Sequence, residues 1–164
     1  MKSCIIPGSF DPVTKGHTEL FKAAARIVDK VYAAILVNSE KRSGFFTPEQ
    51  RYEILKAAVK QVNEECDGKV EAVLYSGLTT DCAVELGASH IVKGVRNTND
   101  FAYEYDLAQI SKRFESSLET VFIPSDPKLA CVSSTYVREL IKYGKLDSAD
   151  FADGTAELIK SYIK

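Results

Sequence analysis

Strand-like and helix-like segments alternate along the whole chain, and this alternation limits the fold more than any other feature. Five short runs of apolar residues have the length and composition of buried strands: 3–6, 31–37, 70–75, 90–92 and 121–123. A stretch with helical periodicity follows each run. This order predicts an α/β fold, with a Rossmann-like, doubly wound, five-stranded parallel sheet and helices on both faces.

Local signals place the helices. The first carries Leu20, Phe21, Ala24, Ile27 and Val28 at helical spacing. The second begins at the capping-box sequence 47–50, Thr-Pro-Glu-Gln. The later helices are expected over about 80–86 with Gly87 after it, from Asn99 or Asp100, over 133–143 with Gly144 after it, and over about 155–162.

Polar loops that contain glycine or serine follow all five strands. They span residues 8–17, 38–44, 76–79, 93–96 and 125–134. The carboxyl ends of parallel strands meet at one edge of a sheet, and ligands bind there. We therefore expect the five loops to converge on a single site.

The first of these loops has the features of a phosphate-binding turn. It joins an apolar strand to an amphipathic helix through Gly8-Ser9-Phe10-Asp11-Pro12 and continues to Gly16-His17. Glycines let the backbone approach a ligand closely, and the first N–H groups of a helix favour an anion. An ordinary tight loop is the alternative for this segment taken alone. Asp11 and Pro12 are expected to shape the turn rather than to meet a ligand.

Length and charge narrow the class of protein. The chain has 164 residues, which suits one domain over residues 1–164. Its formal net charge of −2 offers no basic field for nucleic acid, so we expect no nucleic-acid partner. No apolar run approaches bilayer length, and Met1-Lys2 leads directly into the first strand. We expect a cytoplasmic protein that does not bind membranes.

The cysteines predict neither a metal site nor a disulfide framework. Cys4, Cys66, Cys82 and Cys131 are far apart in sequence, and the chain has only two histidines. Zinc sites are built from closely spaced cysteine or histidine pairs, which this chain lacks. We expect four reduced thiols and no metal held by the protein.

Five motifs together resemble the bacterial phosphopantetheine adenylyltransferase family. They are Gly8 to Pro12, Thr14-Lys15-Gly16-His17, the Lys-Gly-Val-Arg run at 93–96, the Asp-Phe-Ala-Tyr-Glu run at 100–104, and the Val-Ser-Ser-Thr-Tyr-Val-Arg run at 132–138. The wider nucleotidyltransferase superfamily has His-x-Gly-His where this chain has Thr14-x-Gly-His17, a form typical of the phosphopantetheine branch. The likeness spans essentially the whole chain.

The resemblance implies transfer of an adenylyl group from ATP to 4'-phosphopantetheine, which gives dephospho-coenzyme A and pyrophosphate. The acceptor phosphate is already a nucleophile, so such an enzyme must align two anions and neutralise charge at the α-phosphate. By the resemblance, His17 donates to the α-phosphate in the transition state, Ser9 contacts both substrates, and Lys41 holds the acceptor phosphate. The catalytic residues implied are therefore His17, Lys41 and Ser9. His90 is expected to be structural.

Binding residues follow from the same resemblance. Those for ATP are Ser9, Phe10, His17, Gly94, Val95, Arg96, Glu104, Leu129, Val132, Ser133, Ser134 and Thr135. Those for the acceptor are Ser9, Lys41, Leu78, Thr79 and Lys93. Mg²⁺ is expected to arrive with ATP, and the family resemblance implies a homohexamer.

Two departures and two alternatives accompany this prediction. Lys93 stands where the family usually has arginine, and Ile6 where a tyrosine is common. A lysine cannot make the planar bidentate phosphate contact of an arginine. The alternatives are a related adenylyl- or cytidylyltransferase acting on another phosphate such as nicotinamide mononucleotide, which Thr14 and the Ser-Ser-Thr segment count against, and a nucleotide sensor without activity.

Overall fold

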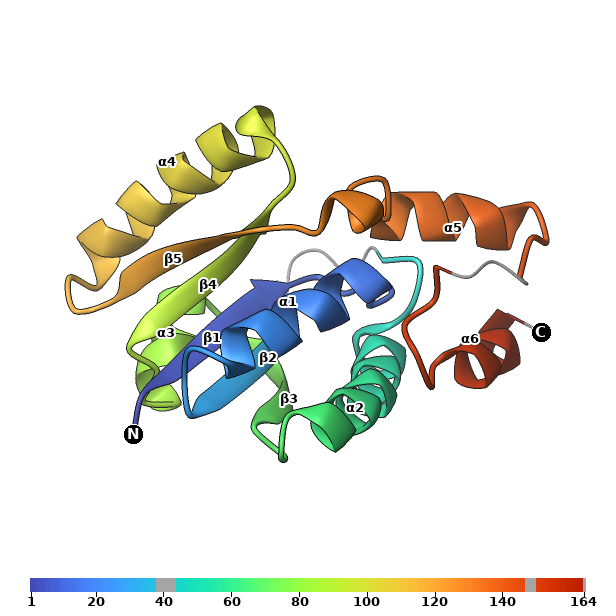
Figure 1. Cartoon of the computed structure of the whole chain (residues 1–164), viewed down its shortest axis with the longest axis horizontal. Helices are drawn as coiled ribbons and strands as arrows, with labels where there is room; N and C mark the ends of the chain where they lie inside the picture. Colours follow the sequence, from blue (N-terminus) through green and yellow to red (C-terminus); the bar gives the residue numbers. More distant parts are fainter. Residues whose placement is uncertain (38–43, 147–149, 164) are drawn as a thin grey trace.

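A five-stranded, all-parallel sheet forms the centre of the computed structural model, which describes residues 1–37, 44–146 and 150–163. The strands are β1 Ser3–Gly8, β2 Lys30–Val37, β3 Val70–Ser76, β4 His90–Val95 and β5 Glu119–Pro124. Their order is β3-β2-β1-β4-β5, so the direction of winding reverses between β1 and β4 (Figure 1). The predicted doubly wound sheet is confirmed. Ligands bind at such a reversal point, outside the carboxyl ends of the strands.

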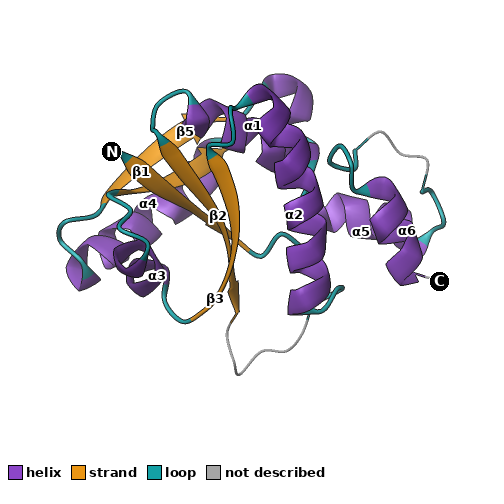
Figure 2. Cartoon of the chain, turned by 90° about the horizontal axis from the view of Figure 1, so that it is seen from below, coloured by secondary structure: helices purple, strands orange, loops and turns teal. Residues whose placement is uncertain are grey.

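Helices lie on both faces of the sheet. They are α1 Lys15–Ala25, α2 Pro48–Glu65, α3 Thr79–Glu85, α4 Thr98–Phe114, α5 Ser134–Lys142 and α6 Ala156–Ile163, with a short 3-10 helix, η1, over Pro127–Leu129. Figure 2 shows α1 and α2 on one face of the sheet and α3 and α4 on the other, with α5 and α6 beyond α2. The arrangement leaves the carboxyl edge of the sheet to the loops.

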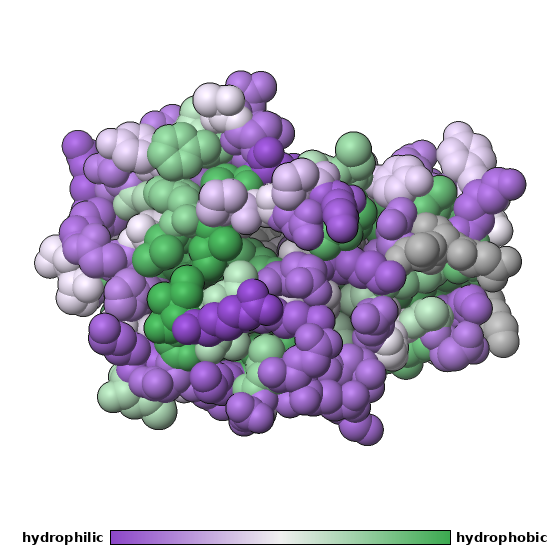
Figure 3. Space-filling view, viewed as in Figure 1, coloured by the Kyte–Doolittle hydropathy of each residue, from purple (hydrophilic) through white to green (hydrophobic). Residues whose placement is uncertain are grey.

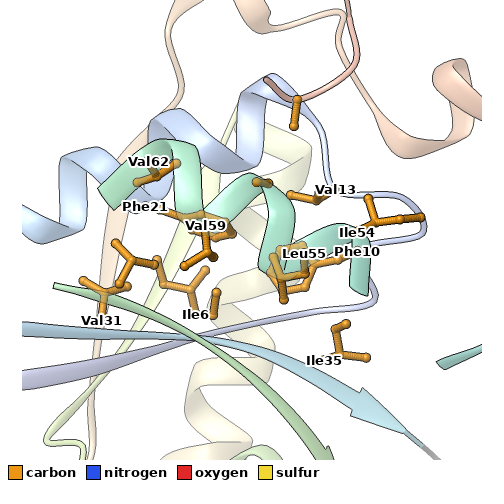
Figure 4. Packing of buried hydrophobic residues seen from close by; sticks show 14 of the residues in the cluster. Ile6, Phe10, Val13, Phe21, Val31, Ile35, Ile54, Leu55, Val59 and Val62 are labelled. Carbon is orange, nitrogen blue, oxygen red and sulfur yellow. The ribbon is translucent and has the colours of Figure 1, made fainter. Parts of the chain in front are cut away.

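The alternation of side chains along β1 divides the core into two clusters. Ile6 and its neighbours on β2 face α1 and α2, where Phe21, Ile54 and Leu55 are fully buried (Figure 4). Ile5 faces the other way and packs with residues of α3 and the segment after it. Successive side chains of a strand point to opposite faces, so an apolar run such as 3–6 belongs in a strand covered on both sides. The isoleucine at position 6 is therefore a packing residue, 2% exposed.

Most predicted element boundaries lie within two residues of the observed ones. Strand β4 continues through Lys93 to Val95 because these residues pair with β5, so the expected loop at 93–96 is shorter. Helix α4 begins at Thr98, because the side chain of Asn97 accepts the Asp100 N–H at 2.9 Å and caps the helix earlier than expected. Helix α1 ends at Ala25, so Ile27 and Val28 lie after it.

None of the helices in the described ranges is both long and apolar enough to cross a bilayer.

Candidate active site

A cavity of about 560 Å³ opens at the carboxyl edge of the sheet, where the winding reverses. Its walls come from three predicted loops and three helices: the β1–α1 loop, the end of β4, the segment after β5, α1, α4 and the start of α5. The predicted convergence is confirmed for these loops. The loop after β3 reaches a second, adjoining cavity, and most of the loop after β2 lies outside the described residues.

His17 is held at the start of α1 by its own turn. The Thr14 backbone N–H donates to its Nδ1 at 3.0 Å, and the Thr14 hydroxyl lies 3.1 Å from the same atom. An imidazole nitrogen that accepts an N–H carries no proton, so in the neutral ring the proton is on Nε2. Since His17 lines the cavity, its Nε2–H is a donor available to a ligand there.

The surroundings keep His17 neutral. Burial, and then the positive charge of Arg96, lower the pKa of His17 to about 4. At neutral pH the ring therefore offers one N–H donor and no positive charge. Such a group stabilises a developing negative charge by hydrogen bonding, without first losing or gaining a proton.

The β1–α1 loop is anchored from several directions. The Asp11 carboxylate accepts the N–H groups of Phe45 and Phe46 at 2.7 and 2.9 Å, which confirms that Asp11 shapes the turn. From α5, the Ser134 hydroxyl donates to the Pro12 carbonyl at 2.8 Å. These contacts tie the loop to segments that are 34 to 122 residues away in sequence.

The N-terminus of α5 faces the same cavity. Ser133 caps the helix, because its Oγ accepts the Tyr136 N–H at 3.1 Å, and its own hydroxyl proton is left to donate elsewhere. Ser133 and Ser134 both line the cavity, as do Gly16 and His17 at the start of α1. Two helix N-termini thus point their first N–H groups toward one space, an arrangement that favours an anion.

Two ion pairs cross the wall formed by β4 and α4. Lys93 Nζ lies 3.0 Å from Glu104 Oε2, and Arg96 Nε lies 2.8 Å from Asp100 Oδ2. The hydrogen bond from Arg96 lowers the pKa of Asp100. Each predicted cationic binding residue in the described part of the wall therefore has a carboxylate partner, and the positive charge there is largely neutralised.

A second cavity of about 230 Å³ adjoins the first, and both share Lys93, Glu104 and Leu107 as lining residues. Its other walls are mostly apolar and come from the loop after β3, β4 and α4. They include Leu78, Thr79, Ile91, Ala108, Ile110 and Phe114. This shape suits a narrow, uncharged chain that leads away from a phosphate in the larger cavity.

Most predicted site residues meet at these two cavities. The larger one is lined by Ser9, Phe10, His17, Lys93, Gly94, Arg96, Glu104, Leu129, Val132, Ser133 and Ser134, and the smaller one by Leu78 and Thr79. Val95 and Thr135 are not among the lining residues. Val95 is the last residue of β4, and the hydroxyl of the exposed Thr135 accepts from Arg138. Lys41 lies outside the described residues.

Several lining residues were not predicted. Asp100 and Tyr103 line the larger cavity and belong to the motif at 100–104, so that motif was the available signal. Leu107, Ala108, Ile110 and Ser111 come from further along α4. Their apolar spacing indicates only a helix face, and nothing local to them predicts a cavity. His90, expected to be structural, bonds Ser89 Oγ through Nδ1 at 2.8 Å at the opposite edge of the sheet.

Within the described ranges, no three histidine, cysteine, aspartate or glutamate side chains form a group that could hold a metal ion. The thiols of Cys4 and Cys82 are buried, which raises their pKa values to about 12 and about 11. Neither thiol forms a disulfide.

The fold and this anion-binding edge define a class that the sequence comparison also identifies. Residues 5–140 match the cytidylyltransferase-like family model, and the chain belongs to that family of nucleotidyltransferases. Within it, the chain belongs with the phosphopantetheine adenylyltransferases. It is 37% identical to the phosphopantetheine adenylyltransferase of Caldanaerobacter subterraneus subsp. tengcongensis over 164 residues, covering 100% of this chain and 99% of the relative. The Clostridium botulinum (strain Hall) enzyme of the same name is 37% identical over 144 residues, covering 88% of this chain and 84% of the relative.

Solved structures share the fold at low identity. A bifunctional NMN adenylyltransferase/ADP ribose pyrophosphatase from Francisella tularensis superposes with a TM-score of 0.72 at 15% identity, covering 99% of this chain and 49% of that one. The Plasmodium falciparum nicotinic acid mononucleotide adenylyltransferase, complexed with NaAD, superposes with a TM-score of 0.57 at 14% identity, covering 99% of this chain and 96% of that one. These likenesses support the Rossmann-like fold and carry no information about the acceptor.

Proposed function

We propose that this protein transfers the adenylyl group of ATP to 4'-phosphopantetheine and releases pyrophosphate and dephospho-coenzyme A. The relatives that share the chain over nearly its full length are named phosphopantetheine adenylyltransferases. The observation in the structure that supports the proposal most is the pair of adjoining cavities. One is larger and lined by helix N-termini, and the other is smaller and mostly apolar.

The two cavities suit the two substrates. The larger one offers N–H groups, hydroxyls and Arg96 to the phosphates of ATP. The smaller one would take the pantetheine arm against Leu78, Thr79 and α4, with the acceptor phosphate at the shared wall beside Lys93. This places the phosphate nucleophile next to the nucleotide, and such alignment supplies much of the acceleration in a transfer between two bound reactants.

His17 acts in this proposal as a neutral donor. The acceptor oxygen attacks the α-phosphorus, the bond to pyrophosphate breaks, and negative charge grows on the α-phosphate oxygens. The Nε2–H of His17 and the N–H groups at the start of α1 would meet that charge. Ser9 would contact both substrates, and Lys41 would hold the acceptor phosphate. No proton needs to leave the acceptor phosphate for the bond to form.

Mg²⁺ fits the site as a partner of ATP rather than as a resident ion. In the described wall, Asp100 and Glu104 are already paired with Arg96 and Lys93, and no acidic cluster is present there. The ion would neutralise the departing pyrophosphate, which the paired cations do only in part. We expect an excess of EDTA to abolish pyrophosphate release and added Mg²⁺ to restore it. Full activity in EDTA would contradict this assignment.

Nicotinamide mononucleotide is the alternative acceptor from the sequence analysis, and it is not favoured, because the relatives that match the chain over most of its length are named phosphopantetheine adenylyltransferases. The mostly apolar walls of the smaller cavity also favour the uncharged pantetheine arm over a charged nicotinamide ring.

Filling the smaller cavity tests the acceptor assignment. Ala108→Phe places a ring among its walls, and we expect the KM for phosphopantetheine to rise at least about tenfold, as for the loss of roughly 1.4 kcal/mol of binding. The KM for ATP should stay within about twofold. Ala102→Phe is the matched control, because Ala102 is an exposed alanine of the same helix that does not line the cavity. Equal KM changes for both variants would move the acceptor arm out of this cavity.

A homohexamer is also part of the proposal. It rests on the family resemblance and on the described surface of α4, where no residue is fully buried. A cytoplasmic location and the lack of nucleic-acid and membrane partners stay predictions from the sequence.

A further inference from the structure

Phe10 is a strained point of the β1–α1 loop. Its φ of +42° lies in the left-handed region, which bulky side chains rarely occupy and which costs roughly 1–3 kcal/mol unless neighbours enforce it. The ring is 2% exposed and packs edge-on against His17 and Phe21, with centroid distances of 5.0 and 5.6 Å. A side chain at Gly8 would lie 2.9 Å from this ring, so glycine is needed there.

Two arginines hold the backbone on either side of Phe10. Arg51, from α2, donates through Nη1 to the Ser9 carbonyl at 3.1 Å. Arg138, from α5, donates through Nη1 to the Asp11 carbonyl at 2.7 Å. The carbonyls before and after the strained residue are thus fixed by helices that approach from different directions (Figure 1). Hydrogen bonds on both sides of Phe10 can enforce its unfavourable left-handed backbone conformation.

The burial of Arg51 is not explained by a purely structural role, because burying an unpaired charge costs free energy. Its side chain is buried, with 9% of the residue exposed, and it forms no ion pair with a described carboxylate. Its Nε is also buried with no hydrogen-bond partner in the described ranges. An arginine kept for stability alone is expected to be paired and fully hydrogen-bonded. Among the described residues, the hydrogen-bond acceptor of its guanidinium is the Ser9 carbonyl.

That bond sets the direction of the next N–H group. The Ser9–Phe10 peptide is trans, and a planar trans peptide points its carbonyl and its N–H in opposite directions. With the Ser9 carbonyl held toward Arg51, the Phe10 N–H points away from it. This N–H donates to no acceptor among the described residues, and Phe10 lines the larger cavity.

We infer that Arg51 is a positioning residue for the transfer reaction: by holding the Ser9 carbonyl, it keeps Phe10 left-handed and turns the Phe10 N–H toward the phosphates in the cavity. The inference rests on the proposed function, because it gives that N–H a phosphate to bind. Arg51 itself lines neither cavity.

Substitution of Arg51 tests the inference. Arg51→Met keeps the length of the side chain and loses the donor, so we expect kcat to fall roughly 10- to 100-fold, as when a donor to the transition state is misplaced. The KM values for ATP and phosphopantetheine should change less than about threefold. Arg51→Lys retains one donor and should give a kcat between those of Arg51→Met and the wild type. Lys69→Met is the matched control, since Lys69 donates to the Ala25 carbonyl at 3.2 Å, away from the site.

A folded Arg51→Met variant with kcat within about threefold of wild type would overturn the inference. If Arg51→Met does not fold, Arg51→Lys decides: a wild-type melting temperature with kcat lowered at least threefold supports the role, and a wild-type kcat overturns it.

A binding measurement separates this inference from the proposed function. In the wild type, the backbone amide resonance of Phe10 should shift when ATP is added, and in Arg51→Met it should not. Absence of adenylyl transfer by the wild-type protein would contradict the proposed function. An ATP-induced shift of the Phe10 amide resonance that is the same in Arg51→Met as in the wild type would contradict the role of Arg51.

Discussion

At the scale of single residues, the hydrogen bond from Thr14 to His17 decides what the histidine can do. Because Nδ1 accepts the backbone N–H, Nε2 carries the proton, and burial beside Arg96 keeps the ring uncharged at neutral pH. The sequence motif predicts a histidine at the phosphates. It does not predict the low pKa, which depends first on burial in the folded chain and then on Arg96, far from His17 in sequence.

His17→Ala should lower turnover roughly 100- to 1,000-fold, the usual loss when one preorganised donor is removed from the transition state. ATP affinity, measured by calorimetry, should change much less. His90→Ala is the control, because it removes the chain's other histidine at the opposite edge of the sheet. A folded His17→Ala variant with turnover within about threefold of wild type would rule out a catalytic role.

The low pKa of His17 also predicts how stability depends on pH. Below the unfolded-state value of 6.5, the unfolded chain protonates this histidine, while the folded protein does so only near pH 4. Stability is therefore lost as pH falls from 6.5 toward 4, by at most about 1.4 kcal/mol per pH unit for one proton. His17→Asn should remove this part of the loss. The measurement is the free energy of unfolding in urea at several pH values between 6.5 and 4. An equal fall in wild type and variant over that range would contradict the low pKa.

At the scale of elements, the loops owe their shape to contacts with distant helices. Local signals were sufficient for the capping box at Thr47, and for the glycines at 87 and 144, which have positive φ after α3 and α5. The extension of β4 depends on pairing with β5, and the loop clamps of Arg51 and Arg138 span 42 and 127 residues. No local pattern encodes such contacts, so the sequence predicted the loop but not what holds it.

Asp11→Ala tests the tether between the β1–α1 loop and the start of α2. It leaves the Phe45 and Phe46 N–H groups without their charged acceptor, and we expect the free energy of unfolding to fall by about 2–4 kcal/mol. Asp29→Ala is the comparison, because the Asp29 carboxylate accepts a backbone N–H at an exposed site, where about 0.5 kcal/mol is expected. Equal losses in the two variants would show that the tether contributes little.

At the scale of the whole molecule, the surface of α4 is the feature that a single chain does not explain. The helix has 17 residues, none of them fully buried in the described chain. It exposes Phe101 and Tyr105, which line neither cavity, and also Tyr103, Ile110 and Phe114, which line one of them. Figure 3 shows apolar surface gathered between α4 and α1, where β5 runs. An amphipathic helix normally buries its apolar face, so association of several chains is expected here.

Light scattering should give the mass of six chains at micromolar concentration. Tyr105→Glu places a charge on the exposed face of α4, outside the residues that line either cavity, and should lower that mass. A monomeric wild type would contradict the homohexamer. The single domain over residues 1–164 also stays a prediction, and one cooperative unfolding transition of the dissociated chain would support it.

The proposed function requires that the α-phosphate of ATP is transferred to 4'-phosphopantetheine. The direct measurement supplies ATP labelled at the α-phosphate, with 4'-phosphopantetheine and nicotinamide mononucleotide present together at equal concentration, and separates the products. We expect the label to appear in dephospho-coenzyme A, with one unlabelled pyrophosphate released for each labelled product. Label that stays in ATP, or that enters the dinucleotide formed from nicotinamide mononucleotide, would contradict the proposed function.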